Sequence, residues 1–357
     1  MDRLFNARGW SDGLPLVPPT PERVHRILTG TDRQPSEVLG SMPPRFGEAT
    51  VEKIAINSLM AGCGPEHLPV ILAAVEAMLA DEFNLYGCQA TTHVVSPLLI
   101  LNGPIVSELG ASGGYNCFGQ GHRSNALIGR AIRLILTNVG GAIPGKLDRA
   151  TFGTPAKFAY CVAENEAENP WQPLQVERGF DSATSTVTLV GAEAPHNIND
   201  HGSISADGLL TTVAQTMCQP GTNNVYYYQE GPWVALSPEH AALVAADGWT
   251  KTDVKRFLFE QSKIPIIRFS RENVERFLLH RWPAWLQEEV RAWLAGEDRD
   301  VRVPIAGRAE DIGVIVAGGA GKHSLFIPTF GATRSVTRPL LLQDGSPAQS
   351  VKDFARR

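Results

Sequence analysis

Residues 115–146 concentrate the residue types that bind small anions, namely glycine, asparagine and arginine. A glycine-rich loop leads there into an expected apolar helix, whose N-terminus exposes unpaired N–H groups and the positive end of the peptide dipole. Glycines let the backbone approach a carboxylate or phosphate, which an arginine can pair through two hydrogen bonds. The residues that we expect to hold the anion are Gly119, Gly121, Arg123, Asn125 and Arg130.

The same segment has a simpler interpretation, in which the glycines form a tight turn and the arginines cover a sheet edge. It does not carry the dinucleotide-binding fingerprint, because Ser124 stands where a glycine is required and no strand immediately precedes the loop. The sequence therefore predicts an anion site here without a nucleotide motif.

A second glycine-rich segment, GGAGKHS at 318–324, follows an expected strand. It is not a nucleoside triphosphate loop, because that motif requires glycine where Val316 stands and Ser or Thr where His323 stands. A strand that ends in glycines could still hold an anion or stabilise developing charge. We expect Lys322 and His323 to act in catalysis and Ser324 to contact the substrate, with a plain turn as the alternative.

Cys63 lies between two glycines just before an expected helix, and His67 follows one turn later. A helix N-terminus lowers the pKa of a thiol, and a thiolate beside an imidazole is a nucleophile with its base. Both residues are therefore candidate catalytic groups. The alternative is a buried structural cysteine, which is the commoner role of a lone cysteine.

His93 begins an apolar, β-branched run at residues 93–101, which is typical of a strand covered on both faces. A histidine at the end of such a strand can line a pocket and serve as a general acid or base. We count His93 among the catalytic candidates, with a core histidine whose hydrogen bonds are satisfied as the alternative.

The segment HNINDH at 196–201 combines possible metal ligands in one polar loop. Nitrogen and oxygen ligands suit a divalent cation, although the spacing matches no standard zinc motif. A divalent metal held by His196, Asp200 and His201 is therefore possible, and a solvated turn is the alternative.

The composition is that of an ordinary globular protein of 357 residues with a net charge of -5. No basic block or apolar membrane span occurs, so we expect neither nucleic acid nor membrane as a partner. Five cysteines without a CxxC pair, and no apparent export signal, predict a cytoplasmic protein. Aromatic runs near 226–228 and 282–293 fit either a core or a subunit contact, so a homo-oligomer or a partner subunit is expected.

Strand and helix patterns interleave along the chain, which predicts an α/β or mixed α+β fold in two lobes. We expect an N-terminal lobe over 1–165 with the glycine and arginine loop, and a C-terminal lobe over 180–357 with the GGAGKHS segment. The polar residues 163–179 between them suggest a hinge. Two Pro-Glu-His segments, at 65–67 and 238–240, both open expected helices and hint at a duplication.

Four segments together resemble a family of uncharacterised bacterial proteins that is sometimes labelled after a selenocysteine-Gly-Ser-Cys (UGSC) motif. These are GWSDGLPLVPPT, MAGCGPEHLPV, NALIGRAIRL and SPEHAALVAADGW. The resemblance covers most of the chain and implies a bacterial cytosolic enzyme. It supplies no reaction, and this chain contains no Cys-Gly-Ser-Cys, so no redox role is taken from it.

These observations favour an enzyme acting on a small anionic substrate, a lyase or hydrolase at a carbon–heteroatom bond. The alternatives are a metal-dependent lyase or hydrolase that uses the HNINDH segment, and a non-catalytic metabolite-binding subunit. The sequence does not identify a cofactor, and it predicts the substrate only as carrying a carboxylate or phosphate.

Overall fold

The computed structural model describes residues 2–355 and has a mixed α+β fold, as the interleaved patterns predicted. The chain forms two compact units. Unit 1 comprises the chain up to Ala194, Ala317–Gly319 and the segment from Arg334 onward, and unit 2 comprises Pro195–Val316 and Ala320–Thr333. Residues 163–179 therefore lie inside unit 1, and the last segment returns to unit 1 instead of completing a second lobe over 180–357.

Unit 1 is built on a four-stranded sheet, in the order β12 (Val336–Pro339), β5 (Thr186–Ala192), β3 (Ser96–Asn102) and β4 (Cys161–Ala163). The central strand β3 has no charged residue and is buried throughout, as its apolar sequence predicted. It pairs in parallel with β4 and antiparallel with β5, while β5 pairs antiparallel with β12. This last pairing explains why the C-terminal segment belongs to unit 1.

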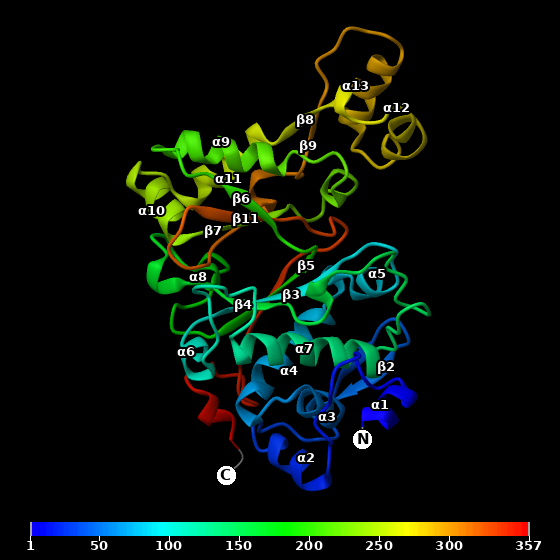
Figure 1. The fold of residues 1–357 in the computed structure, drawn as a ribbon, viewed down its shortest axis with the longest axis vertical. Helices are drawn as coiled ribbons and strands as arrows, with labels where there is room; N and C mark the ends of the chain where they lie inside the picture. Colours follow the sequence, from blue (N-terminus) through cyan, green and yellow to red (C-terminus); the bar gives the residue numbers. More distant parts are fainter. Residues whose placement is uncertain (1, 356–357) are drawn as a thin grey trace. The chain divides into compact units, whose positions relative to one another are not determined.

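The helices of unit 1 lie against this sheet and against one another, and Figure 1 shows α7 beside α4. In α7 the isoleucines at positions 128, 132 and 135 recur at helical spacing and are buried. A short hairpin of β1 (Val38–Met42) and β2 (Gly47–Thr50) precedes α3. The helices are α1 (Asp2–Arg8), α2 (Pro21–Leu28), α3 (Val51–Ala61), α4 (Leu68–Met78), α5 (Leu85–Gln89), α6 (Ile105–Leu109), α7 (Arg123–Asn138) and α8 (Leu174–Glu177).

Unit 2 is built on a second four-stranded sheet, in the order β10 (Gly313–Val316), β7 (Trp233–Leu236), β11 (His323–Ile327) and β6 (His196–Asn199). The central strand β7 pairs in parallel with β10 and antiparallel with β11, while β11 pairs antiparallel with β6. Both parallel strands are buried at every position.

The main helices of unit 2 are α9 (Ala206–Met217), α10 (Pro238–Ala246) and α11 (Lys251–Gln261). Thr250 with Asp253 three positions later predicts a capping box at the start of α11. The box is present, because Thr250 and Asp253 exchange side-chain and backbone hydrogen bonds. Beyond α11 a ribbon of β8 (Lys263–Pro265) and β9 (Arg302–Pro304) carries α12 (Arg271–Asn273) and α13 (Ala284–Leu294). Among residues 2–355, no helix has both the length and the apolar character needed to cross a membrane.

The β-branched and aromatic run at 225–228 predicts a short strand, and this prediction is wrong. The structure has a short 3-10 turn at Asn223–Val225 instead. Buried side chains hold this turn, since Asn224 donates to Thr329 Oγ1 at 2.7 Å and the Trp282 indole donates to the Val225 carbonyl at 2.7 Å. These side-chain contacts satisfy polar groups that a strand would have paired with its neighbours.

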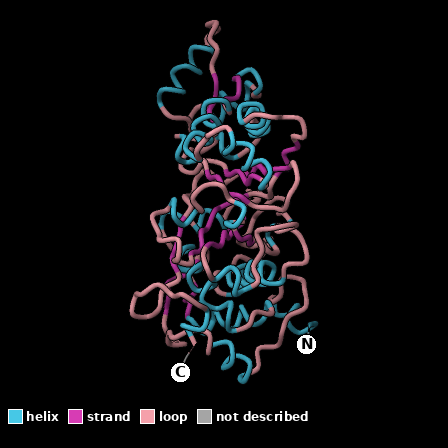
Figure 2. The backbone as a smooth tube through the Cα atoms, turned by 90° about the vertical axis from the view of Figure 1, so that its left-hand side faces the viewer, coloured by secondary structure: helices cyan, strands magenta, loops and turns pink. Residues whose placement is uncertain are grey.

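The two units repeat one order of elements around their central strands. A helix comes before the central strand (α4 or α9), two helices follow it (α6 and α7, or α10 and α11), and then come the parallel neighbour (β4 or β10) and the antiparallel neighbour (β5 or β11). Unit 1 inserts α5 and α8 into this order, and unit 2 inserts the β8–β9 ribbon with α12 and α13. The fourth strands are exchanged, because the chain leaving β5 forms β6 of unit 2 and the chain leaving β11 forms β12 of unit 1. Figure 2 shows the helices in cyan and the strands in magenta along the backbone.

The two Pro-Glu-His segments occupy different places in this repeat. Pro65–His67 forms a 3-10 turn before α4, upstream of the central strand of unit 1. The segment at 238–240 opens α10, downstream of the central strand of unit 2. The shared tripeptide is therefore not a trace of the structural repeat, although the repeat itself exists.

Candidate active site

Arg130 is paired within the protein and is not placed to bind an anion. Its guanidinium makes two hydrogen bonds to the carboxylate of Asp12, at 2.7 and 2.9 Å, and a third to the Pro15 carbonyl at 2.8 Å. The Asp12 side chain is almost fully buried. The predicted anion ligand is thus the anchor that holds the N-terminal segment against α7.

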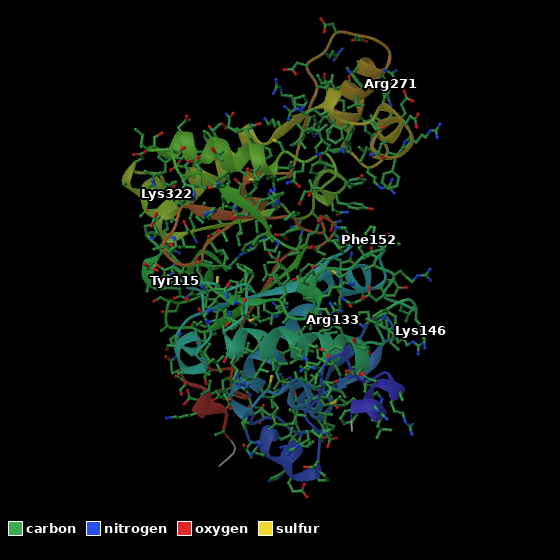
Figure 3. All side chains as sticks on the ribbon, viewed as in Figure 1. Tyr115, Arg133, Lys146, Phe152, Arg271 and Lys322 are labelled. Carbon is green, nitrogen blue, oxygen red and sulfur yellow. The ribbon has the colours of Figure 1, made fainter. Side chains whose placement is uncertain are left out.

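Arg133, one turn further along α7, lies inside unit 1 (Figure 3). Its guanidinium donates to neutral acceptors, the Lys157 carbonyl at 2.8 Å, Ser96 Oγ at 3.3 Å and Gln89 Oε1 at 3.4 Å. Burial lowers its pKa. Arg133 therefore organises the interior around β3.

The glycine loop before α7 is closed by its own contacts. Asn125 is buried, and its side chain bonds the N–H and carbonyl of Ser112 at 2.9 and 2.8 Å and the Cys117 carbonyl at 3.2 Å. These bonds use the amide that was expected to bind substrate. Asn125 thus fixes the loop at 112–117.

The remaining predicted anion ligands do not form a pocket with Asn125. Arg123 is exposed and donates to the Gly62 carbonyl at 3.4 Å. Gly121 has φ +106°, which glycine adopts without strain, and a side chain at Gly119 would collide with Asn116. The glycines therefore make the tight turn that was the alternative interpretation.

Cys63 is buried and is not an activated thiol. Burial raises its pKa, the opposite of the shift expected from a helix N-terminus, and nearby Glu66 raises it further. Its Sγ lies 3.5 Å from the Leu127 carbonyl. A thiol that stays protonated is a poor nucleophile, so the structure assigns Cys63 to the core.

His67 is a buried helix cap. Its Nδ1 accepts the Gly64 N–H at 3.1 Å, so in the neutral ring Nε2 carries the proton and donates to Ser124 Oγ at 3.2 Å. Ser124 in turn donates to the Leu109 carbonyl. Glu66, 3.1 Å from Nδ1, favours protonation, but desolvation is the larger effect and lowers the pKa of His67. His67 cannot accept a proton from Ser124, because the ring nitrogen that faces this hydroxyl, Nε2, already carries a proton.

His93 is held between two partners. Its Nδ1 accepts the Val95 N–H at 3.2 Å, and its Nε2 lies 2.8 Å from Glu193 Oε1. The His93 side chain is 17% exposed. This arrangement matches the core histidine with satisfied hydrogen bonds that was the alternative to a catalytic base.

The HNINDH segment does not form a metal site. Asp200 accepts four hydrogen bonds, from Gly202 N, Ser203 N, Ser203 Oγ and Thr212 Oγ1, and these lower its pKa to about 2 in spite of desolvation. His196 and His201 are exposed. Among residues 2–355, no group of three or more His, Cys, Asp or Glu side chains is arranged to hold a metal ion. Asp200 therefore shapes the turn.

Ser324 and His240 form a buried hydroxyl–imidazole pair in unit 2. Ser324 Oγ lies 2.8 Å from His240 Nδ1, and His240 Nε2 lies 3.1 Å from the Asp200 carbonyl. A carbonyl only accepts, so Nε2 carries the proton of the neutral ring and Nδ1 accepts the Ser324 hydroxyl. Both residues are 2% exposed, and burial lowers the pKa of His240 and keeps the ring neutral.

Local backbone geometry positions this pair. Ser324 is the second residue of β11 and lies opposite Leu236, the last residue of β7. Ser237 then caps α10, its hydroxyl accepting the His240 N–H and its own N–H donating to Ser324 Oγ, both at 3.4 Å. The hydroxyl therefore lies at the carboxyl end of a central strand and at the N-terminus of a helix.

Exposed basic side chains adjoin Ser324 along the chain. Lys322, labelled in Figure 3, and His323 are both exposed, and Lys322 Nζ donates to the His201 carbonyl at 3.2 Å. The rings of His201 and His323 meet edge to face with centroids 5.2 Å apart. Three predicted site residues from two segments, at 201 and 322–323, are thus brought together.

No known protein-family model matches this chain, and no curated protein matches it either. The candidate site therefore rests on geometry. Sequence reasoning identified Ser324 as a site residue but gave His240 no role. The one local feature that could have pointed to His240 is its place in the Pro-Glu-His segment that opens α10. Its partner lies 84 residues further along the chain.

Proposed function

We propose that the protein is a hydrolase that attacks small anionic substrates with the Ser324 hydroxyl, using His240 as the general base. The supporting observation is the direction of one hydrogen bond. His240 Nδ1 is the acceptor that the structure offers to the Ser324 hydroxyl, at 2.8 Å, because the other ring nitrogen is committed to the Asp200 carbonyl. A serine beside an oriented imidazole is the arrangement that activates this nucleophile.

In the proposed reaction, Ser324 Oγ forms a bond to the carbonyl carbon or phosphorus of an ester while its proton passes to His240 Nδ1. The imidazolium is stabilised by the Nε2–H bond to the Asp200 carbonyl, 3.1 Å long. His240 then gives that proton to the departing alcohol oxygen as the ester bond breaks. Water, deprotonated by the same nitrogen, hydrolyses the covalent intermediate and restores Ser324.

The start of α10 supports the negative charge that develops on Ser324. The Ser237 N–H, at the helix N-cap, donates to Ser324 Oγ at 3.4 Å. The positive end of the helix dipole favours an anion at this place. The pair thus combines a base on one side of the hydroxyl with a positive field on the other.

The proposal that the substrate is anionic comes from the basic surface formed by Lys322, His323 and His201. Their side chains are exposed beside the start of β11, and Lys322 supplies a fixed positive charge there. A carboxylate or phosphate on the substrate would be attracted to this surface. All five cysteines are free, which supports our inference that the enzyme works in the cytoplasm.

A panel of small p-nitrophenyl esters, with and without a carboxylate or phosphate group, tests this function. We expect the anionic esters to be hydrolysed, Ser324→Ala to abolish turnover, and Lys322→Ala to raise KM for the anionic esters alone. Ser124→Ala is the matched control, because Ser124 also contacts a histidine but donates to a carbonyl. Wild-type turnover in Ser324→Ala would contradict the assignment.

A cavity of about 810 Å³ beside the β8–β9 ribbon supports a second candidate function, metabolite binding without catalysis. Aromatic and basic side chains both line it, a combination that suits a planar anion. Calorimetry with aromatic carboxylates and nucleotides would detect such a ligand, and Trp285→Ala should weaken it. The lining includes Tyr228, Phe259, Lys263, Arg281, Trp285 and Arg302.

A further inference from the structure

The carboxyl end of β3 in unit 1 gathers oxygen-bearing side chains. Asn102 ends β3, and Thr186, which begins β5, is its direct partner in the antiparallel ladder. Cross-strand partners carry their side chains on the same face of the sheet. Glu164 and Glu166 follow β4, the parallel neighbour of β3, and Gln175 lies in α8.

Hydrogen bonds connect these residues into one cluster. The Asn102 amide nitrogen donates to Glu164 Oε2 at 2.6 Å and to Glu166 Oε1 at 3.1 Å. The Gln175 amide nitrogen donates to Glu166 Oε2 at 3.3 Å. Both amide groups therefore adjoin the Glu166 carboxylate through their nitrogens.

Three oxygens of this cluster are buried without a partner: Asn102 Oδ1, Gln175 Oε1 and Thr186 Oγ1. Among residues 2–355 they are the full set of buried side-chain nitrogen and oxygen atoms in that condition, and all three residues are 0% exposed. A buried polar atom without a hydrogen bond is destabilising. Their concentration at one place offers several oxygen lone pairs to one bound group.

The charge of the cluster points the same way. Glu166 accepts hydrogen bonds from the Gly103 N–H and from the amides of Asn102 and Gln175, which are neutral donors. Within the described residues no lysine, arginine or histidine pairs with Glu166. The Glu166 side chain is half-buried, and carboxylates withdrawn from water are normally paired or coordinate a metal.

We propose that this cluster binds a hard divalent cation. Carboxylate, amide and hydroxyl oxygens without nitrogen or sulfur ligands are the donor set of Ca²⁺, Mg²⁺ and Mn²⁺. Glu164 and Glu166 supply the negative charge, and the amide oxygens of Asn102 and Gln175 with the Thr186 hydroxyl complete the shell. Bound there, the ion joins the ends of β3 and β5 to α8 and stabilises unit 1.

Metal-stripped full-length protein provides the test. After EDTA treatment and dialysis, we add Ca²⁺, Mg²⁺ or Mn²⁺ separately, measure the Tm of unfolding, and count bound ions by equilibrium dialysis and elemental analysis. At a hundredfold excess over Kd the bound ion should raise Tm by about 5 °C. A response to Ca²⁺ alone identifies a larger, flexible site, and a response to Mg²⁺ and Mn²⁺ identifies an octahedral one.

Two variants and one control decide whether the ion binds at this cluster. Glu166→Gln should remove the bound ion and the Tm response, whereas Glu168→Gln, in the same turn but exposed, should keep both. Thr186→Val keeps the shape of the side chain but removes its hydroxyl, so the variant should fold without the ion. Its Tm should rise less than that of the wild type when the ion is added. The proposal is overturned if no cation binds, or if Glu166→Gln and Thr186→Val respond as the wild type does. A buried water would then be the occupant.

Discussion

Each unit contains one buried serine that contacts a buried histidine, and the two contacts run in opposite directions. In unit 1 the Gly64 N–H occupies His67 Nδ1, so the ring donates to Ser124, whose own proton goes to a carbonyl. In unit 2 the Asp200 carbonyl occupies His240 Nε2, so the ring accepts from Ser324. A backbone group on the far side of each ring decides whether the histidine is a cap or a base.

The units also differ in what they place at the carboxyl end of the central strand. Ligands of open α/β sheets bind at this edge, since strand ends and helix N-termini meet there. Unit 1 has oxygen-bearing side chains at this edge, around Asn102 at the end of β3. Unit 2 fills it with Ser237 and Ser324 at the end of β7. One topology thus presents two chemistries, and variants of each unit can separate them.

Replacing the buried histidine of each unit should give the largest difference between the units, measured as the loss of ester hydrolysis. His240→Gln removes the proposed base and should lower kcat/KM for an anionic ester by roughly 10²- to 10⁴-fold. His67→Gln should leave the rate unchanged in folded protein, because His67 donates to Ser124 and takes no proton from it. Steady-state kinetics of both variants, with circular dichroism to establish folding, provides the comparison. An equal loss of kcat/KM in the two variants would show that the two serine–histidine contacts do not differ in function.

Breaking one ion pair in each unit should give the next largest effect. In unit 1, Asp12→Asn leaves Arg130 without its carboxylate, and the side chains are only 4% and 15% exposed. The cost should be about 3 kcal/mol of unfolding free energy, because a largely buried charge is left unpaired. In unit 2, the exposed pair of Arg302 and Asp300 provides the control, because its side chains are 51% and 71% exposed.

Urea denaturation measures both changes. Asp300→Asn should produce no measurable loss of stability, because an exposed ion pair is screened by solvent. The comparison fails if Asp12→Asn is as stable as the wild type. It also fails if Asp12→Asn abolishes ester hydrolysis in folded protein.

Acidification should affect both histidines in the same direction. Burial lowers the pKa values of His67 and His240 below the ordinary value of 6.5. In the unfolded chain both take up a proton near pH 6.5, while the folded protein resists it, so their stabilising contribution is full above that pH and falls as the pH drops below it. The rate should fall only where His240 itself is protonated, at a lower pH than the loss of stability begins. Thermal melts and pH–rate profiles check this order.

Thiol reactivity should show the smallest difference. The four cysteines of unit 1 (Cys63, Cys88, Cys117 and Cys161) are buried, whereas Cys218 of unit 2 is half-buried. Native protein should therefore react with Ellman's reagent first at Cys218, and Cys63→Ala should not change turnover. Fast reaction at Cys63 would restore it as a nucleophile candidate.

Local patterns were sufficient to predict many of the elements. Thr20 followed by Pro21 predicts a helix start, and α2 begins there. The capping box at Thr250 and the buried strand β3 likewise follow from capping residues and spacing. Such features depend on neighbours within one or two turns, so the sequence carries them directly. The strand expected at 225–228 failed because side chains from distant segments hold that turn.

The site was predicted less well, because its chemistry depends on partners far along the chain. Arg130 has the type and position of an anion ligand, yet Asp12, 118 residues away, already pairs with it. His240 gained its role from Ser324 and from the Asp200 carbonyl, neither of which its local pattern indicates. The exchange of the edge strands β6 and β12 could not be predicted either, because the sequence pattern of a strand does not show which sheet the strand joins.

Covalent labelling with a small fluorophosphonate, followed by peptide mass spectrometry, tests the central claim that His240 activates Ser324. The account predicts a label on Ser324 in the wild type, at least roughly a hundredfold slower labelling in His240→Gln, and none on Ser124. Labelling of Ser324 at the same rate without His240, or its absence from the wild-type protein, would contradict the account.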